Sequence, residues 1–351
     1  FVRELFNERY KGIDRLMRVF HNGQIEGRYF SAPLKWFQED HSFSEKNNRY
    51  QQLAVQFGIE AIRQTLGQPD TLRNAVPCEA IDAIFFISSS GIATPSIEVT
   101  IMNRLPFSAQ TKRIPIWGLG CAGGAAGIAR AAEYCTAFPT ANVLVLSVEL
   151  CSLTFQRNDV SKSNLVGASL FADGVACTLV CGDQSPLLHE SLVSPLPYVV
   201  EHQSILMPDS EDVMGWDVKD SGLHVLFSKD IPSIVEKWLR PSVEQFLYNR
   251  SLTIEKINHF ICHPGGRKVL EAYSDSLQIA HHKLQMAYDV LKNYGNMSSA
   301  TVLYVLKRYM KSTASEGDKG LLLALGPGFS AEIVLLKWTD KQQRKKSHVV
   351  S

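Results

Sequence analysis

Residues 114–150 read IPIWGLGCAGGAAGIARAAEYCTAFPTANVLVLSVEL. This stretch predicts a short strand, a glycine-rich turn, a helix of small residues and a fully apolar strand at 142–149. Such an order is a β-turn-α-β unit, and Cys121 lies on its turn. The stretch therefore predicts an α/β fold with a cysteine at the start of a helix.

The same layout occurs again near the C-terminus. Residues 294–300 (YGNMSSA) open the helical stretch TVLYVLKRYMKS, which the predicted strand GLLLALGPG follows. Likewise INHFICHPGG at 257–266 matches the apolar-strand-then-glycine pattern of IDAIFFISSSG at 81–91. We interpret the two halves as an internal duplication whose equivalent turns face each other across one core. Other α/β chains also show such similarities, so the pattern alone leaves the duplication open.

Three further helices are predicted on the N-terminal side of this unit. Residues 5–28 have the pattern of a basic amphipathic helix, residues 43–67 that of a long helix ending at Gly67, and residues 95–105 are helix-like. The chain begins at Phe1 rather than Met, so we expect further residues before it.

Composition excludes several classes of protein. The 351 residues are 45% hydrophobic, which is enough to bury a large core and excludes disorder. Lys and Arg number 36 against 35 Asp and Glu, so the charge balance points to neither nucleic acid nor an anionic membrane. The sequence lacks the run of about 18 apolar residues that a membrane span needs, and its N-terminus is charged throughout. We therefore expect a soluble, cytoplasmic protein.

The seven cysteines are an odd number scattered through apolar stretches, without the close spacing of a disulfide framework. We expect six of them to be buried free thiols. Cys177 and Cys181 form the one close pair, but they lie in a strand pattern without a nearby His, so no metal site is expected.

Cys121 is the exception among the cysteines. It has small neighbours on both sides and a helix directly after it. A helix N-terminus stabilises a thiolate, and small neighbours let a substrate reach the sulfur. The alternative is a buried structural thiol, because small residues at a helix start also serve close packing.

His263 and Asn296 lie on comparable turns. His263 follows the apolar strand HFIC and precedes Pro-Gly-Gly, at a strand end where open α/β sheets collect their chemistry. Asn296 lies in a turn that starts a helix, where Asn also serves as an N-cap. Together with Cys121 they form a set of thiol, imidazole and amide that is suited to acyl transfer.

Five motifs in order resemble the type III polyketide synthases: GLGCAGG, LVGASLFADGVA, ICHPGGRKVLEA, YGNMSSATVLYVL and ALGPGFSAE. The resemblance runs from about residue 10 to residue 338. It implies a thiolase-like subunit of five layers, α/β/α/β/α, with an N-terminal half at 1–190 and a C-terminal half at 191–351. It also implies a homodimer that uses acyl-CoA and malonyl-CoA as substrates, with no metal or organic cofactor.

By this resemblance, Cys121 accepts the acyl group, and His263 and Asn296 hold the thioester carbonyl of malonyl-CoA as it decarboxylates. Loss of carbon dioxide leaves an enolate, and two donors aimed at its oxygen stabilise charge that develops in the transition state. We further expect Cys121 to be a thiolate paired with a protonated imidazole.

The resemblance extends to the substrate path. Phe171 matches the family's first gatekeeping phenylalanine, whereas Val225 stands where plant members carry the second. Arg15 and Arg18 are implied to bind the coenzyme A phosphates, whereas Asn22 replaces a third basic residue of the family. We expect Lys268 to compensate for that loss. The positions implied to line the cavity are Cys151, Thr154, Trp216, Ser298, Gly326, Pro327 and Gly328.

These departures from the plant pattern favour a bacterial-type enzyme. MGWDVKDSGL resembles bacterial members that use long fatty acyl starters, so we predict an alkylpyrone or alkylresorcinol synthase. Two alternatives are a ketoacyl synthase of fatty-acid synthesis and a non-catalytic thiolase-fold scaffold that binds acyl chains.

Overall fold

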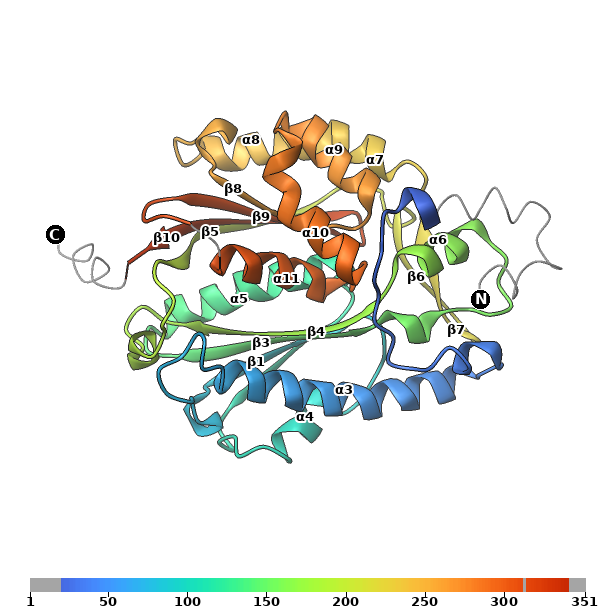
Figure 1. Ribbon diagram of the computed structural model, residues 1–351, viewed down its shortest axis with the longest axis horizontal. Coiled ribbons are helices and arrows are strands. Elements are labelled where there is room, and N and C mark those ends of the chain that lie inside the picture. Colours follow the sequence, from blue (N-terminus) through green and yellow to red (C-terminus); the bar gives the residue numbers. More distant parts are fainter. Residues whose placement is uncertain (1–19, 312–313, 341–351) are drawn as a thin grey trace.

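The computed structural model describes residues 20–311 and 314–340, and its layers are visible in Figure 1. Two four-stranded sheets lie on either side of a central pair of helices, α5 and α11. Further helices cover the outer face of each sheet, which gives the five layers α/β/α/β/α that the sequence predicts. The predicted helix at 5–28 lies largely outside the described residues.

The first sheet has the order β2-β1-β3-β4. β1 is parallel to β2 and β3, whereas β4 runs antiparallel to β3. Helices α3 and α4 cover its outer face (Figure 1). The elements are β1 (Ala83–Ile87), β2 (Lys112–Ile116), β3 (Asn142–Leu150), β4 (Asp173–Cys181), α3 (Phe43–Leu66) and α4 (Ile97–Met102).

The second sheet has the order β5-β10-β9-β8. β8 is parallel to β9, and β10 is antiparallel to both β9 and β5. Helices α8 and α9 cover its outer face (Figure 1). The elements are β5 (Leu196–Leu206), β8 (His259–Cys262), β9 (Lys319–Gly326), β10 (Ser330–Thr339), α7 (Ile231–Ile234), α8 (Arg240–Tyr248), α9 (Arg267–Leu277) and α10 (Gln285–Tyr294).

The two sheets confirm the internal duplication. In each, a parallel pair (β1 and β3, β8 and β9) is followed by an antiparallel partner (β4, β10). Each central helix directly precedes the middle strand of its sheet: α5 (Gly123–Ala137) leads to β3, and α11 (Ser299–Met310) leads to β9. The turns that start these two helices therefore meet at one end of the molecule.

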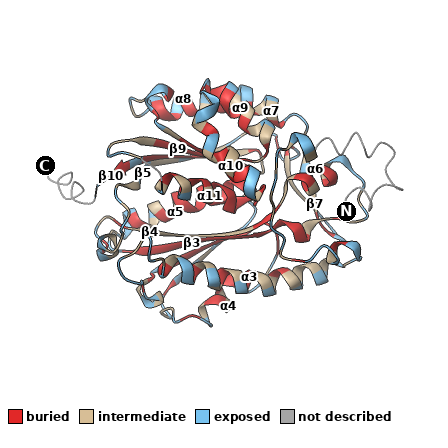
Figure 2. Cartoon of the chain, in the orientation of Figure 1, coloured by how far each residue is buried: buried red, intermediate tan, exposed pale blue. Residues whose placement is uncertain are grey.

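Small residues let the central helices approach closely. A Cβ on Gly124 of α5 would lie 2.1 Å from the carbonyl oxygen of Ser299 in α11, so a larger residue is excluded there. Figure 2 shows both helices mostly buried, with the exposed residues of α5 in its last two turns. The small-residue run after Cys121 thus serves packing as well as access to the sulfur.

A capping box begins the long helix α3, which the sequence pattern at 43–67 predicts. Ser42 caps α3 by accepting from the backbone N–H of Glu45, and the Glu45 carboxylate accepts from the backbone N–H of Ser42.

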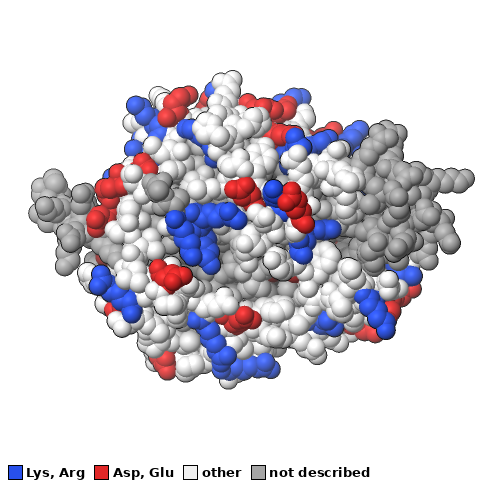
Figure 3. Space-filling view, viewed as in Figure 1, with Lys and Arg blue, Asp and Glu red and all other residues white. Residues whose placement is uncertain are grey.

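On the face drawn in Figure 3, basic and acidic side chains are interspersed. None of the helices within the described residues has the length and apolar content to cross a membrane. The seven cysteines form no disulfide, and three of them (Cys78, Cys177 and Cys181) are only half-buried.

A hairpin and a short helix stand at the end of the molecule where the central helices begin (Figure 1). The hairpin consists of β6 (Met214–Lys219) and β7 (Gly222–Phe227), and the helix is α6 (Lys162–Leu170). Two 3-10 turns complete this end: η3 (Gly120–Ala122) before α5, and η4 (Cys151–Thr154) after β3.

Candidate active site

The nucleophile turn holds Cys121 in η3, directly before α5. Its side chain is buried, with 8% exposed, and Sγ lies 3.9 Å from both Asn296 Oδ1 and Ser298 Oγ. The preceding Gly120 has φ +47°, and a Cβ there would lie 2.7 Å from Pro327 Cδ. This turn therefore requires glycine for both its conformation and its contact with the loop after β9.

Asn296 is held by two backbone groups. Its Nδ2 donates to Gly265 O at 3.0 Å, and its Oδ1 accepts from the N–H of Ser298 at 2.9 Å. Because one partner only accepts and the other only donates, these bonds fix the orientation of the amide. The N-cap of α11 is Ser298, with φ +47°, so the N-cap alternative for Asn296 is wrong.

His263 follows β8 and is also buried. Its backbone N–H donates to Leu323 O of the neighbouring strand, which fixes the residue at the strand end. Within the described residues, neither ring nitrogen has a hydrogen-bond partner. Burying an imidazole without a hydrogen-bond partner lowers the stability of the fold, so a role in binding a ligand explains this position better than a structural role. The adjacent Gly265 also accepts from Asn296, so one turn joins the two side chains.

Burial is the main cause of the pKa shifts of Cys121 and His263. It raises the pKa of the Cys121 thiol to about 12, although hydrogen bonding with Ser298 and Asn296 acts in the opposite direction. Burial also lowers the pKa of His263 to about 3. Burial therefore favours the neutral thiol and the neutral imidazole, whereas the sequence predicts a thiolate and an imidazolium.

A buried carboxylate behind the nucleophile escaped the sequence analysis. Glu149 at the end of β3 accepts from Ser89 N at 3.0 Å and Ser90 Oγ at 2.8 Å, and its other oxygen accepts from Ser299 Oγ. Burial raises the pKa of Glu149, while these donors favour its ionised form. Gly120 N also donates to Ser89 Oγ, so the network connects β1, β3, α11 and the nucleophile turn. A charged residue inside the apolar run NVLVLSVEL was the signal that could have revealed it.

Glu149→Ala is expected to lower the free energy of unfolding by about 3 kcal/mol, because it removes the carboxylate that accepts from three buried donors, of which only Ser299 Oγ has a second acceptor, Ser147 Oγ, within the described residues. Urea unfolding followed by circular dichroism measures this. Glu149→Gln is the matched control: it keeps the volume and one acceptor oxygen, and so should lose less. An Ala variant as stable as the wild type would show that the network contributes no stability.

Phe171 is tied directly to Asn296. The two residues form a parallel bridge, in which Asn296 N donates to Leu170 O and Ala172 N donates to Asn296 O, both at 2.9 Å. The Phe171 ring lies 5.9 Å from that of Trp216 and 5.6 Å from that of Phe227, centroid to centroid. The predicted gatekeeper therefore stands beside Asn296, against the β6–β7 hairpin.

Position 225 lacks the second ring, and the alternative from the strand pattern is that Phe227, two residues on, supplies it. Val225 and Phe227 are two residues apart in β7 and so lie on one face, opposite Trp216 and Met214 of β6. Val225 faces α6, because a Cβ on Gly167 would lie 3.1 Å from its Cγ1. Phe227 stacks on Phe171 from the same face, so an aromatic ring is present here although position 225 lacks one.

The remaining predicted residues are placed differently from one another. Cys151 is buried close enough to Cys121 for the two to affect each other's ionisation, and Thr154 donates to its carbonyl oxygen at 2.8 Å. Gly326 and Pro327 pack against the nucleophile turn: a Cβ on Gly326 would lie 2.5 Å from Leu119 O. Gly328 has φ +113°. Lys268 is exposed at the start of α9. Arg15 and Arg18 lie outside the described residues.

Comparison with known proteins shows which family the chain resembles. The models for the N- and C-terminal domains of chalcone and stilbene synthases match residues 40–184 and 198–339. The chain is 51% identical to a candidate chalcone synthase of Bacillus subtilis (strain 168), over 96% of this chain and 93% of that protein. It is 35% identical to the 1,3,6,8-tetrahydroxynaphthalene synthase of Streptomyces peucetius subsp. caesius, over 93% and 85% of the two chains.

A solved structure also matches the chain over most of its length. The crystal structure of 1,3,6,8-tetrahydroxynaphthalene synthase from Streptomyces coelicolor A3(2), a bacterial type III polyketide synthase, matches with a TM-score of 0.88 and 30% sequence identity. The match covers 96% of this chain and 92% of that one.

Proposed function

Because the chain belongs to the chalcone and stilbene synthase family of type III polyketide synthases, we propose that it extends a long-chain fatty acyl-CoA with malonyl-CoA to give alkylpyrones or alkylresorcinols. It is accordingly an acyltransferase that catalyses decarboxylative Claisen condensation, rather than a ketoacyl synthase of fatty-acid synthesis or a non-catalytic scaffold. The starter, the product and the residue roles below are the proposal.

The observation that supports the residue roles is that Asn296 lies 3.9 Å from the Cys121 sulfur and donates to Gly265 O in the turn of His263. Cys121 Sγ attacks the thioester carbonyl of the starter, and His263 takes the thiol proton, because both groups are neutral beforehand. His263 returns this proton to the leaving sulfur, so coenzyme A departs as its thiol and the acyl group stays on Cys121. The unpartnered imidazole and the second N–H of Asn296 Nδ2 then stabilise the enolate formed from malonyl-CoA. The enolate carbon attacks the acyl-cysteine and releases the thiol.

The side chains around Phe171 support the proposal of a long-chain starter. Val225 is smaller than a phenylalanine and packs beside Gly167, which has no side chain of its own. Space on this face would accept alkyl carbons, and each buried methylene contributes about 0.8 kcal/mol. Phe227 and Trp216 would form the apolar wall of the passage.

Catalytic efficiency is expected to rise with acyl length through medium chains, and Val225→Phe should depress palmitoyl-CoA use at least about tenfold more than hexanoyl-CoA use. The measurement is kcat/KM for both starters, with products identified by mass spectrometry. Leu226→Phe is the matched control, since that exposed residue points to the opposite face of β7. Equal use of the two starters by the wild type, with a ratio unchanged in Val225→Phe, would contradict the long-chain proposal.

Four further features belong to the same proposal. The enzyme acts as a homodimer in the cytoplasm, and each subunit has halves at 1–190 and 191–351. Coenzyme A is bound through its phosphates by Arg15, Arg18 and Lys268, of which Lys268 is exposed and follows His263 by five residues. The reaction uses no metal or organic cofactor.

A further inference from the structure

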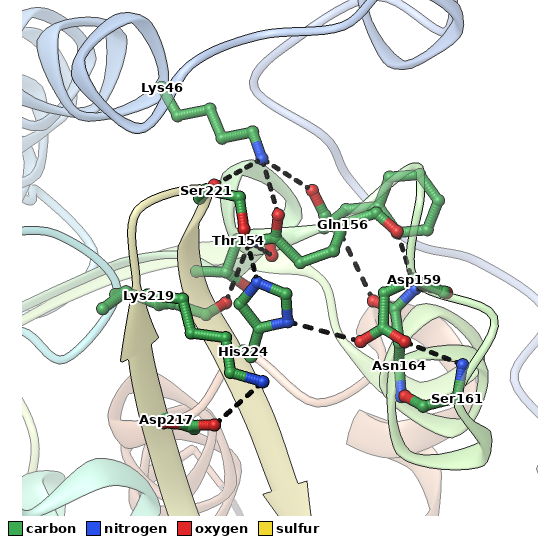
Figure 4. Close-up of polar contacts among 12 residues, drawn as sticks. Lys46, Thr154, Gln156, Asp159, Ser161, Asn164, Asp217, Lys219, Ser221 and His224 are labelled. Atoms are coloured by element: carbon green, nitrogen blue, oxygen red, sulfur yellow. Dashed lines mark hydrogen bonds and ion pairs between the residues drawn. The ribbon is translucent and has the colours of Figure 1, made fainter.

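A second group of reactive side chains lies at the tip of the β6–β7 hairpin (Figure 4). Ser221 Oγ is 2.7 Å from His224 Nε2, and His224 Nδ1 is 3.3 Å from Asp159 Oδ2. Ser221 is exposed in the turn of the hairpin, His224 lies in β7, and Asp159 comes from the loop before α6. Hydroxyl, imidazole and carboxylate are thus in line, as in a serine hydrolase.

The hydrogen bonds determine which atom carries each proton. An ionised carboxylate can only accept, so the hydrogen of the neutral imidazole is on Nδ1, facing Asp159. Nε2 is then an acceptor, and the Ser221 hydroxyl donates to it. This is the tautomer in which His224 can take the hydroxyl proton as general base.

Asp159 is held in place from behind. Its Oδ1 accepts from Ser161 N at 2.8 Å, and its backbone carbonyl accepts from Asn164 Nδ2 at 2.6 Å (Figure 4). Partial burial opposes ionisation of Asp159, but the hydrogen bonds from Ser161 and His224 outweigh it and lower its pKa. The carboxylate is therefore charged at neutral pH and oriented before any substrate arrives.

The group opens into a cavity of about 520 Å³. Trp36, Phe37, Leu153 and Phe155 supply apolar lining, and Ser221, His224 and Asp159 lie among its polar lining residues. Lys46 also lines it, with Nζ 3.3 Å from the carbonyl oxygen of Ser221 (Figure 4). The cavity can hold a small acyl group, with a cation beside the candidate nucleophile.

This cavity is distinct from the site around Cys121. Ser152 and Leu153 of η4 line it, whereas Cys151 of the same turn is buried beside Cys121. The turn η4 therefore separates the two sites, and the triad has its own access to solvent through Ser221.

We propose that Ser221, His224 and Asp159 form a second catalytic site that hydrolyses small carboxylic esters or thioesters. Ser221 Oγ attacks the acyl carbonyl, and His224 Nε2 takes the hydroxyl proton. The three N–H groups of Lys46 already donate to Phe155 O, Gln156 Oε1 and Ser221 O, so this side chain favours the oxyanion through its positive charge rather than through a hydrogen bond. The bond to the leaving alcohol or thiol breaks, and His224 returns the proton to it. Water then attacks the acyl-serine, its proton passes through His224 to Ser221 Oγ, and a carboxylic acid is released.

The test uses Cys121→Ala protein, so that the cysteine cannot contribute. A fluorophosphonate probe is added and the labelled peptide is identified by tandem mass spectrometry, and hydrolysis of 4-nitrophenyl butyrate and butyryl-CoA is measured in parallel. We expect the label on Ser221, and at least about a hundredfold lower hydrolysis after a further Ser221→Ala or His224→Gln change. Asp159→Asn should also slow hydrolysis, because a neutral amide no longer favours the His224 tautomer that has its hydrogen on Nδ1.

Ser228→Ala is the matched control. Ser228 lies just beyond the other end of β7, beside the carboxylate of Asp230 and without a bonded imidazole, so it should be neither labelled nor needed for hydrolysis. Absence of an adduct on Ser221, or hydrolysis that survives Ser221→Ala, would overturn the proposal. The three side chains would then only tie the hairpin to the loop before α6. Because the cysteine is absent throughout, either outcome leaves the proposed polyketide synthesis untouched.

Discussion

Replacing Cys121 by Ala is expected to lower product formation by at least about a thousandfold, because no other group can accept the acyl chain at that place. The thiol sits in a turn of small residues and makes two long contacts at 3.9 Å, so little packing is lost with it. Product release is measured by liquid chromatography and mass spectrometry, and the fold by circular dichroism.

Two comparisons make this variant informative. Malonyl-CoA decarboxylation should survive in Cys121→Ala, because the assignment gives that step to His263 and Asn296. Cys151→Ala is the matched control, since this neighbouring buried thiol is not expected to carry the acyl group. The assignment of the nucleophile would be contradicted if Cys121→Ala gave the wild-type product yield. It would also be contradicted if only Cys151→Ala lost product formation.

Asn296→Ala is expected to slow malonyl decarboxylation by about a hundredfold or more, which is the usual effect of removing one donor from a developing oxyanion. Loading of the starter on Cys121 should be less affected, since the thiol and the imidazole remain. Release of ¹⁴C-labelled carbon dioxide measures the first step, and intact-protein mass spectrometry measures the second.

The contacts of Asn296 suggest a second variant. Asn296→Asp keeps an oxygen to accept from Ser298 N, 2.9 Å away in the wild type, but removes the amide donor. It should therefore lose decarboxylation as Ala does while keeping the bond from Ser298 N and losing the bond to Gly265 O. Ser298→Ala is the matched control, because it keeps the amide and removes only a hydroxyl near Sγ. Equal loss of both half-reactions in Asn296→Ala would mean that the side chain is structural.

Much of the fold could be predicted because local patterns and burial agree there. The apolar run before Glu149 is buried throughout as β3, and the capped pattern at 43–67 forms α3. The helix expected at 95–105 is shorter, Ile97–Met102, because Pro95 and Ser96 precede its first turn and Asn103 ends it. The duplication was visible because each half places a glycine-rich turn before its central helix.

The parts that depend on three-dimensional neighbours could not be predicted. The pairing of Phe227 with Phe171 needs the register of the hairpin, which sequence leaves open. The direction of the pKa shifts of Cys121 and His263 follows from how deeply both are buried, not from their residue types. Ser221, His224 and Asp159 meet only because the hairpin folds over the loop before α6, and no motif joins them in the sequence.

The most direct test of the central claim is to find where the acyl group resides. The enzyme is mixed with palmitoyl-CoA alone, quenched in acid within seconds, digested with pepsin and mapped by tandem mass spectrometry. The account predicts a single palmitoyl thioester on the peptide that contains Cys121. A stoichiometric palmitoyl adduct on Cys151 or any other residue, with Cys121 unmodified, would contradict it.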